Sequence, residues 1–234
     1  MIKADAFATR YMLDHLVEMI SEERWQKFHE VLDQRTRWIT VVLEDIFQPH
    51  NASAVIRTCE LMGVQDLHII ENQNLYEINP DIVVGSNKWL TMRKYNQLEH
   101  NTLNCFDQLR QNGYRIVATS PHKNDCLISE LPLNQKTAIV LGTEGPGLSD
   151  VAMQNADAFV KIPMHGFTES YNISVSAALT MYELCGRLRR EVTHWQLTEQ
   201  EREMLLLDYA LKSIKNPRTF IRRMKMELEG HLEK

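Results

Sequence analysis

Paired cysteines and closely spaced histidines are both missing from this sequence. Its four cysteines, Cys59, Cys105, Cys126 and Cys185, include no C-x-x-C pair, so we expect neither a disulfide framework nor a cysteine-bound zinc ion. The nine histidines show neither H-x-x-x-H nor H-E-x-x-H spacing. We therefore predict no metal site.

Long apolar segments are missing as well. The longest runs, such as 39–43 and 138–141, are far shorter than the roughly 20 residues that cross a bilayer. Charged residues at positions 5, 10, 14 and 18 interrupt the N-terminal segment, which is unlike a signal peptide. We expect no membrane association and a cytoplasmic location.

Proline and glycine are too scarce, at seven and nine of 234 residues, for a collagen-like or low-complexity chain. What is present is ordinary: 44% of residues are hydrophobic and 24% are charged, as in globular proteins with a sizeable core.

Charge is distributed unevenly along the chain. Residues 185–234 hold 11 Lys and Arg against 8 Asp and Glu, whereas the other 184 residues carry a net charge of −8. Residues 211–226 contain six cations and no acid. This asymmetry suggests a polyanionic partner, although a solvated helix face is the better explanation of the cations taken alone.

Hydrophobic patterning predicts a central domain between two helical extensions. Apolar residues recur at helical spacing through 1–35, and short apolar strands then alternate with helices. The predicted strands are 39–43, 67–70, 90–95, 115–119, 137–141 and 159–163, and the predicted helices are 51–61, 103–111, a short one from Ser149 or Asp150, 171–190, 198–210 and 217–229. This order predicts an α/β fold, a mostly parallel sheet flanked by helices. We expect a helical N-terminal extension over 1–37, the sheet domain over 38–190 and a helical C-terminal extension over 191–234.

Three loops follow predicted strands, where α/β proteins place their binding sites. The first, residues 48–58, contains Asn51, a candidate helix cap or ligand contact, and Arg57. The second, residues 141–149, is rich in glycine but lacks the lysine of a phosphate-binding loop. The third, residues 162–176, runs from Ile162-Pro163-Met164 into a segment of small polar residues, where Ser170 or Asn172 could cap a helix.

Together these loops resemble the three motifs of the SPOUT class of RNA methyltransferases. The similarity is greatest to its SpoU/TrmH branch, which methylates ribose 2′-hydroxyl groups. The family patterns N-x-[GS]-[AS]-[IL]-x-R-T, G-x-E-x-x-G and I-P-M…S-L-N-V-S-V-A correspond here to residues 51–58, 142–147, 162–164 and 170–176. Tyr171, Ile173 and Ser176 replace the usual Leu, Val and Ala in the third motif.

The resemblance implies a fold, a cofactor and an assembly. The fold would contain a C-terminal trefoil knot, and the protein would be a homodimer that binds S-adenosyl-L-methionine. The residues implied in cofactor binding are Thr119, Gly142, Gly147, Ile162, Met164, Tyr171 and Asn172. Those implied in catalysis are Arg57, Asn51, Ser170, Asn172 and Glu144.

The resemblance implies that Arg57 is the base that takes the 2′-hydroxyl proton, the role proposed for the residue at this position in the family. A guanidinium group holds its proton in proteins, however, which makes it a poor base. The alternative is that Arg57 binds a neighbouring phosphate through two hydrogen bonds and the proton leaves through that phosphate or water. The sequence leaves both roles open.

The two extensions resemble those of family members that methylate guanosine 18 in the D-loop of tRNA. We therefore expect tRNA as substrate, with ribosomal RNA as the alternative. A non-catalytic RNA-binding module of the same fold is a further alternative, and the intact polar motif positions argue against it. The expected phosphate contacts are Arg24, Lys27, Arg35, Arg37, Lys212, Lys215, Arg218, Arg222, Arg223 and Lys225.

Overall fold

The computed structural model describes residues 6–120, 126–143 and 145–232, with side chains up to residue 229. The chain divides into two units, one formed by residues 36–195 and the other by residues 1–35 together with 196–234. We refer to them as the sheet unit and the helical unit. Most of both expected extensions therefore lies in one unit, the helical unit.

Seven strands form one sheet in the order β3-β2-β1-β6-β4-β7-β5. They are β1 (Ile39–Glu44), β2 (Asp66–Ile70), β3 (Thr91–Tyr95), β4 (Arg115–Thr119), β5 (Cys126–Leu127), β6 (Thr137–Leu141) and β7 (Ala158–Lys161). Every pairing is parallel, which confirms the predicted sheet. The two-residue strand β5 carries no hydrophobic pattern of its own and was not predicted.

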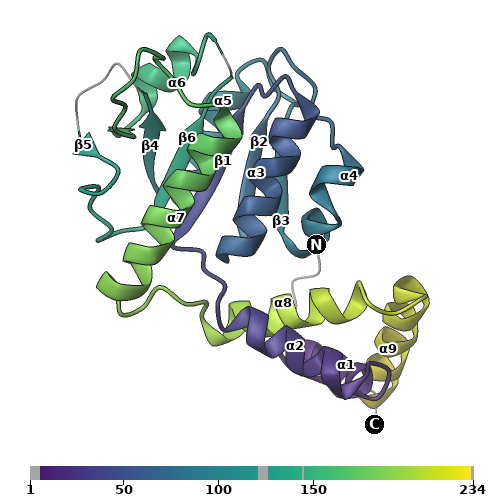
Figure 1. The fold of residues 1–234 in the computed structure, drawn as a ribbon. Coiled ribbons are helices and arrows are strands. Elements are labelled where there is room, and N and C mark those ends of the chain that lie inside the picture. Colours follow the sequence, from purple (N-terminus) through teal and green to yellow (C-terminus); the bar gives the residue numbers. More distant parts are fainter. Residues whose placement is uncertain (1–5, 121–125, 144, 233–234) are drawn as a thin grey trace. The chain divides into compact units, whose positions relative to one another are not determined.

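Alternation along the strands fills a core on each face of the sheet. Ile39, Val41 and Leu43 of β1 belong to one buried cluster, whereas Val42 belongs to the other. The first cluster includes buried residues of α3 (Pro49–Met62) and α7 (Ile173–Glu191), and the second includes those of α5 (Asn101–Gln111) and α6 (Asp150–Asn155). The sheet and the helices on its two faces form three layers, with α3 and α7 side by side on one face (Figure 1).

Short helices complete the region between β2 and β3, where the sequence pattern is weak. They are α4 (Pro80–Val83) and the 3-10 helix η1 (Ser86–Trp89). Asn79 caps α4, because its side chain accepts a hydrogen bond from the N–H of Asp81.

Helix α3 begins two residues earlier than the sequence predicts. Its first residue is Pro49 and its N-cap is Gln48, since proline suits the first helical position, where no backbone donor is needed. Asn51 is therefore not the cap. It lies in the first turn, where its side chain is buried.

The helical unit joins both ends of the chain. Helices α1 (Ala6–Val17) and α2 (Glu22–Leu32) pack against α8 (Glu199–Leu211), and α9 (Pro217–Leu232) packs against α1. A capping box between Thr198 and Glu201 starts α8. Met12, Leu16, Ala210, Phe220 and Met224 form the core of this unit. Each pair of terminal helices thus buries its apolar face against the other pair.

One buried carboxylate ties three elements of the sheet unit together. Glu44, the last residue of β1, accepts hydrogen bonds from Thr102 Oγ1 (2.6 Å), Ser149 Oγ (2.8 Å) and the Ser149 N–H (2.9 Å). Thr102 lies in the first turn of α5, and Ser149 caps α6 by accepting from the Ala152 N–H (3.1 Å). Glu44 therefore holds the starts of two helices at the end of a central strand.

Replacing Glu44 by alanine should destabilise the protein by about 2–3 kcal/mol, because charge-assisted hydrogen bonds are lost and buried donors lose their acceptor. The measurement is the urea unfolding midpoint at constant slope. Glu99→Ala, at an exposed position, serves as the matched control and should change the stability by less than about 0.5 kcal/mol. Equal effects of the two substitutions would contradict the role of Glu44.

Candidate active site

The second and third motif loops meet at the carboxyl ends of β4, β6 and β7, and the first motif loop follows the neighbouring strand β1. Thr119, Leu141 and Lys161 end these strands. Two adjoining cavities, of about 80 Å³ and about 590 Å³, lie there and share Thr119, Ser120, Ser170, Tyr171 and Ser176 in their walls. We call the combined space the strand-end groove.

The second motif forms a closed turn along the groove. Thr143 and Gly147 exchange backbone hydrogen bonds of 3.0 and 3.2 Å. A side chain at Gly142 would have its Cβ only 2.3 Å from the carbonyl carbon of Gly147, and Gly147 has a φ of +76°. Both glycines are therefore needed for the turn itself. Its backbone can come close to a ligand because no side chains project from these positions.

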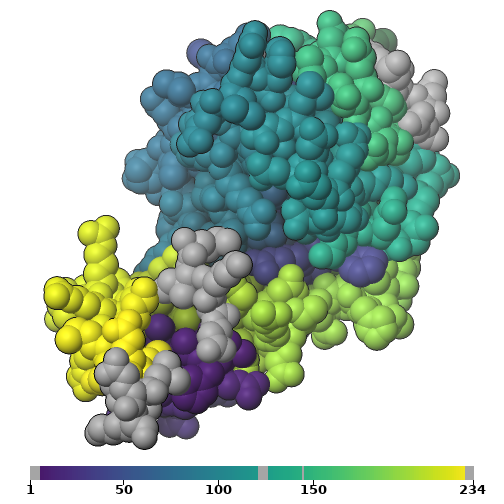
Figure 2. Space-filling view, turned by 180° about the vertical axis from the view of Figure 1, so that it is seen from behind, coloured from purple at the N-terminus to yellow at the C-terminus, as the bar shows by residue number. Residues whose placement is uncertain are grey.

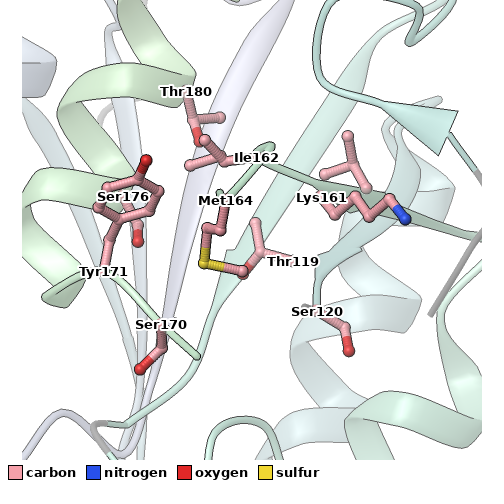
Figure 3. Close-up of a pocket in the computed structure, with 10 residues that line it drawn as sticks. Thr119, Ser120, Lys161, Ile162, Met164, Ser170, Tyr171, Ser176 and Thr180 are labelled. Atoms are coloured by element: carbon pink, nitrogen blue, oxygen red, sulfur yellow. The ribbon is translucent and has the colours of Figure 1, made fainter. Parts of the chain in front are cut away.

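The smaller cavity has a largely apolar wall, formed by Val160, Ile162 and Met164. Figure 3 shows Thr119 and Met164 from the strand ends and Tyr171, Ser176 and Thr180 from the third motif and α7 around this space. Among the described residues, Thr180 Oγ1 is buried without a hydrogen-bond partner. A flat apolar ligand with polar edges suits such a wall, because buried hydroxyl groups normally find a partner.

A chain of amide side chains links the first motif to the third. Asn172 caps α7 by accepting from the Ser174 N–H (2.8 Å), and it donates through Nδ2 to Asn51 Oδ1 (3.3 Å). Asn51 in turn donates through Nδ2 to Gln48 Oε1 (3.1 Å). Each amide thus fixes the orientation of the next. Of the two candidate caps of the third motif, the structure selects Asn172.

Arg57 does not take part in this series of amide hydrogen bonds. It lies six residues beyond Asn51 on α3, which is about 9 Å along a helix axis. Its side chain is exposed, and it is absent from the described walls of the groove. Within one copy of the chain, the structure therefore does not bring Arg57 together with Asn51 and Asn172.

The loop after β2 supports the first motif from the other side. The N–H of Asn79 donates to Ser53 Oγ (2.8 Å), and Ser53 donates to the Pro49 carbonyl (2.7 Å). The same loop is held by Glu71, which accepts from the Tyr76 N–H (2.8 Å). Burial alone would raise the pKa of Glu71, but hydrogen bonds from Tyr76, Asn96 and Lys94 outweigh it and lower the pKa. Glu71 thus stays ionised while it holds the loop.

The other residues that the resemblance implies in binding or catalysis mostly line the groove. The groove wall contains Thr119, Gly142, Gly147, Ile162, Met164, Ser170, Tyr171 and Asn172. The Thr119 hydroxyl donates to the Val140 carbonyl (3.0 Å), and the Tyr171 hydroxyl donates to the Pro163 carbonyl (3.3 Å). Glu144 lies outside the described residues.

Sequence reasoning missed Ser120, Lys161, Ser176 and Thr180 as groove residues. Ser176 belongs to the third motif, and Thr180 follows it by four residues on α7, so the two side chains share one helix face. That spacing was the available signal. Lys161 and Ser120 directly adjoin predicted residues but are not distinguished by any motif.

The predicted RNA-contacting cations are mostly exposed. Arg24, Lys27, Lys215, Arg218, Arg222, Arg223 and Lys225 are exposed on the helical unit, and Lys212 is partly buried beside Asp208. Figure 2 shows α9 as the yellow surface. Arg218, Arg222 and Lys225 are spaced along one face of α9, opposite the buried Phe220, Met224 and Leu228.

Two of the cations predicted to contact RNA, Arg35 and Arg37, are not exposed. Arg35 is only 1% exposed, so its guanidinium cannot reach a phosphate in this structure. Arg37 forms an ion pair with the buried carboxylate of Asp66 at 3.2 Å. Both residues are the last basic positions before β1, where the chain enters the sheet.

Neither a metal cluster nor a membrane helix is found in the part of the chain that the structure describes. No three His, Cys, Asp or Glu side chains are grouped closely enough to hold an ion among these residues. None of the described helices is long and apolar enough to span a bilayer.

Comparisons with known proteins place the chain among RNA methylases. The model of the SpoU rRNA Methylase family matches residues 38–182. A tRNA (guanosine(18)-2′-O)-methyltransferase of Borreliella burgdorferi is 44% identical over 201 residues, which cover 86% of this chain and 90% of the relative. The enzyme of the same name from Thermus thermophilus is 33% identical over 163 residues, covering 70% and 82% of the two chains.

A solved structure shows the same fold. The TrmH/SpoU tRNA modifying enzyme of A. aeolicus superimposes with a TM-score of 0.73 at 29% identity, covering 83% of this chain and 98% of that one. The family match includes all three motif loops and more than half of the chain. The chain therefore belongs to the SpoU rRNA methylase family.

Proposed function

We propose that this protein transfers a methyl group from S-adenosyl-L-methionine to the ribose 2′-oxygen of guanosine 18 in the D-loop of tRNA. The observation that carries the proposal is the meeting of the second and third motif loops in the strand-end groove, to which the Asn51–Asn172 hydrogen bond connects the first motif. The relatives from B. burgdorferi and T. thermophilus are named as guanosine-18 methyltransferases of tRNA, which supports the choice of nucleotide.

The residues of the groove fit the proposed cofactor, which supplies a methyl group already activated on a sulfonium. Ile162 and Met164 provide apolar contact for the adenine ring, and Thr180 Oγ1 offers a buried polar atom beside it. The turn closed by Gly142 and Gly147 brings its backbone groups next to the ligand. Thr119 and Tyr171 complete the wall. We also propose that this region forms the trefoil knot of the family.

Because the methyl donor is activated, the protein has mainly to orient the reactants and help the 2′-hydroxyl proton to leave. Asn51 and Asn172 hold each other at the end of the groove, where they can orient the ribose. Ser170, exposed in the wall of the groove, can donate to the ribose or the cofactor. We assign to Glu144 the role of fixing the motif loops.

The exposed position of Arg57 is explained if the protein is a homodimer. Tyr182, 71% exposed, follows Val175 and Leu179 along one exposed apolar face of α7, and α7 packs beside α3, which carries Arg57 and the exposed Leu61. Pairing of this α3–α7 face between two copies would bury these apolar side chains and place Arg57 beside the partner. We propose that Arg57 acts in the partner's active site, where its guanidinium binds the phosphate next to the target ribose.

The helical unit is the proposed contact for the body of the tRNA. The phosphate contacts are assigned to its exposed cations, Arg24, Lys27, Lys215, Arg218, Arg222, Arg223 and Lys225, together with Lys212. With a tRNA substrate, we propose a cytoplasmic location. Ribosomal RNA is the second candidate substrate, because the family model that matches the chain is named for it.

The function is tested with tritiated S-adenosyl-L-methionine and unmodified transcripts of tRNA and ribosomal RNA, followed by mapping of the labelled ribose. We expect label on guanosine 18 of tRNA, and a loss of at least about 100-fold in turnover for Arg57→Ala, which is the range for a positioned catalytic group. Label on ribosomal RNA alone would move the activity to the second substrate. Label on neither RNA would overturn the proposal.

The action of Arg57 across the dimer is tested by purifying a mixed dimer of an Arg57→Ala chain and an Asn172→Ala chain, each with its own affinity tag. If Arg57 serves the partner, one of the two sites is intact, and about half of the wild-type activity should return. If Arg57 serves its own chain, both sites are damaged and the mixed dimer stays as inactive as either variant. Arg57→Ala dimers carrying both tags are the control.

The role of α9 is tested through the salt dependence of tRNA binding. Each phosphate contact contributes about 0.7–0.9 to the slope of log affinity against log salt, so replacing Arg218, Arg222 and Lys225 by glutamine should flatten the slope by about 2–3. Cofactor affinity, measured by calorimetry, should stay unchanged. An unchanged slope would remove this face of α9 from the RNA contact.

A further inference from the structure

A third cavity, of about 200 Å³, opens beside the strand-end groove. Its walls are Ile46, Phe47, Gln48, Asn51, Thr143 and Ile173, and Thr143 and Ile173 also belong to the groove. A cavity of about 150 Å³ in another protein holds a benzene ring, so this space accepts one ring of a ligand but not a whole cofactor. We call it the side pocket.

Phe47 is the unusual member of the side pocket. Its side chain is 74% exposed, although it directly precedes the first motif loop and shares the pocket wall with the buried Asn51. Exposing a phenyl ring to water costs free energy that burial would return. Such a residue beside an active site is more easily explained by a ligand that covers it than by packing.

The backbone holds Phe47 in place. Asp45, two residues before Phe47, has a φ of +52°, and its side chain accepts hydrogen bonds from the N–H groups of Asn72 (2.7 Å) and Gln73 (2.8 Å). The N–H of Asp45 donates to the Ile70 carbonyl (2.9 Å), and Pro49 begins α3 two residues after Phe47. The loop is therefore anchored on both sides of an exposed aromatic ring, as a preorganised contact requires.

Gln48 adds a directional group at the mouth of the side pocket. Its Oε1 accepts from Asn51 Nδ2 (3.1 Å), which turns the Nε2 amino group to the opposite side of the carboxamide. This amino group can donate to the acceptor atoms on the edge of a base.

We propose that the side pocket receives the nucleobase of the target nucleotide, stacked on Phe47 and hydrogen-bonded by Gln48. The ribose of that nucleotide then lies toward Asn51 and Asn172, at the junction with the groove. Aromatic side chains stack on bases that leave a folded RNA, and guanine offers acceptors that suit the Gln48 amino group. The inference rests on the proposed function, which it extends from the cofactor to the nucleotide that accepts the methyl group.

The test compares Phe47→Ala and Phe47→Tyr with the wild-type enzyme in methyl transfer to the transcript that the wild type methylates. Loss of base stacking on Phe47 should raise KM for the RNA by about 5- to 150-fold. The Tyr variant should restore KM to near the wild-type value, because its ring can stack as well. Leu75→Ala is the matched control, since Leu75 is also exposed, at 77%, and lies outside the pocket walls.

Two further measurements identify other occupants of the side pocket. Calorimetric affinity for S-adenosyl-L-methionine should be the same in the Phe47→Ala variant and the wild type, and a loss there would assign the side pocket to the cofactor instead. Sedimentation should show the same oligomeric state, and dissociation of the variant would assign Phe47 to a subunit interface. Either result overturns the inference, as does a KM equal to that of Leu75→Ala.

The wild-type enzyme tests the proposed function, whereas the Phe47 variants test this inference, so the two failures can be told apart. If the wild type methylates neither tRNA nor ribosomal RNA, the proposed function fails and the inference fails with it. If the wild type is active and only the Phe47 comparison fails, the proposed function stands and the base lies elsewhere.

Discussion

Parallel pairing of the central strands is the constraint on which the rest of the sheet unit depends. The register sets Leu43 opposite Leu141 and Ala118 opposite Val140, so β1, β6 and β4 end at the same edge of the sheet. Loops that are far apart in the sequence therefore leave the sheet together. The groove, the side pocket and the Asn51–Asn172 hydrogen bond all lie at this edge.

Much of this arrangement was predictable because it follows from local patterns. Short apolar runs predicted six of the seven strands in the described part of the chain, and the second and third motif loops contain most of the groove wall, including Gly142 and Met164. Pro49 carried the signal for the earlier start of α3. Asn172, as one of two candidate caps, was confirmed by its hydrogen bond to Ser174.

The remainder depends on contacts between distant residues. Glu44 is a carboxylate at the end of a mostly apolar strand, which could have drawn attention to it, but its partners Thr102 and Ser149 are 58 and 105 residues away. The burial of Arg35 could not be read from its charge. The sharing of one unit by both extensions was also out of reach, because each extension has an amphipathic pattern that does not specify its partner.

The shared helical unit has a consequence for how the chain is made. Helices α1 and α2 pack against α8, and α1 also packs against α9. Arg10 pairs with Glu203, and Tyr11 donates to Glu227, 216 residues further along the chain. During synthesis these first helices leave the ribosome with an uncovered apolar face, while the whole sheet unit is made after them and can fold before them. Helices α1 and α2 are thus among the last elements to reach their native contacts, because α8 and α9 are made only after the whole sheet unit.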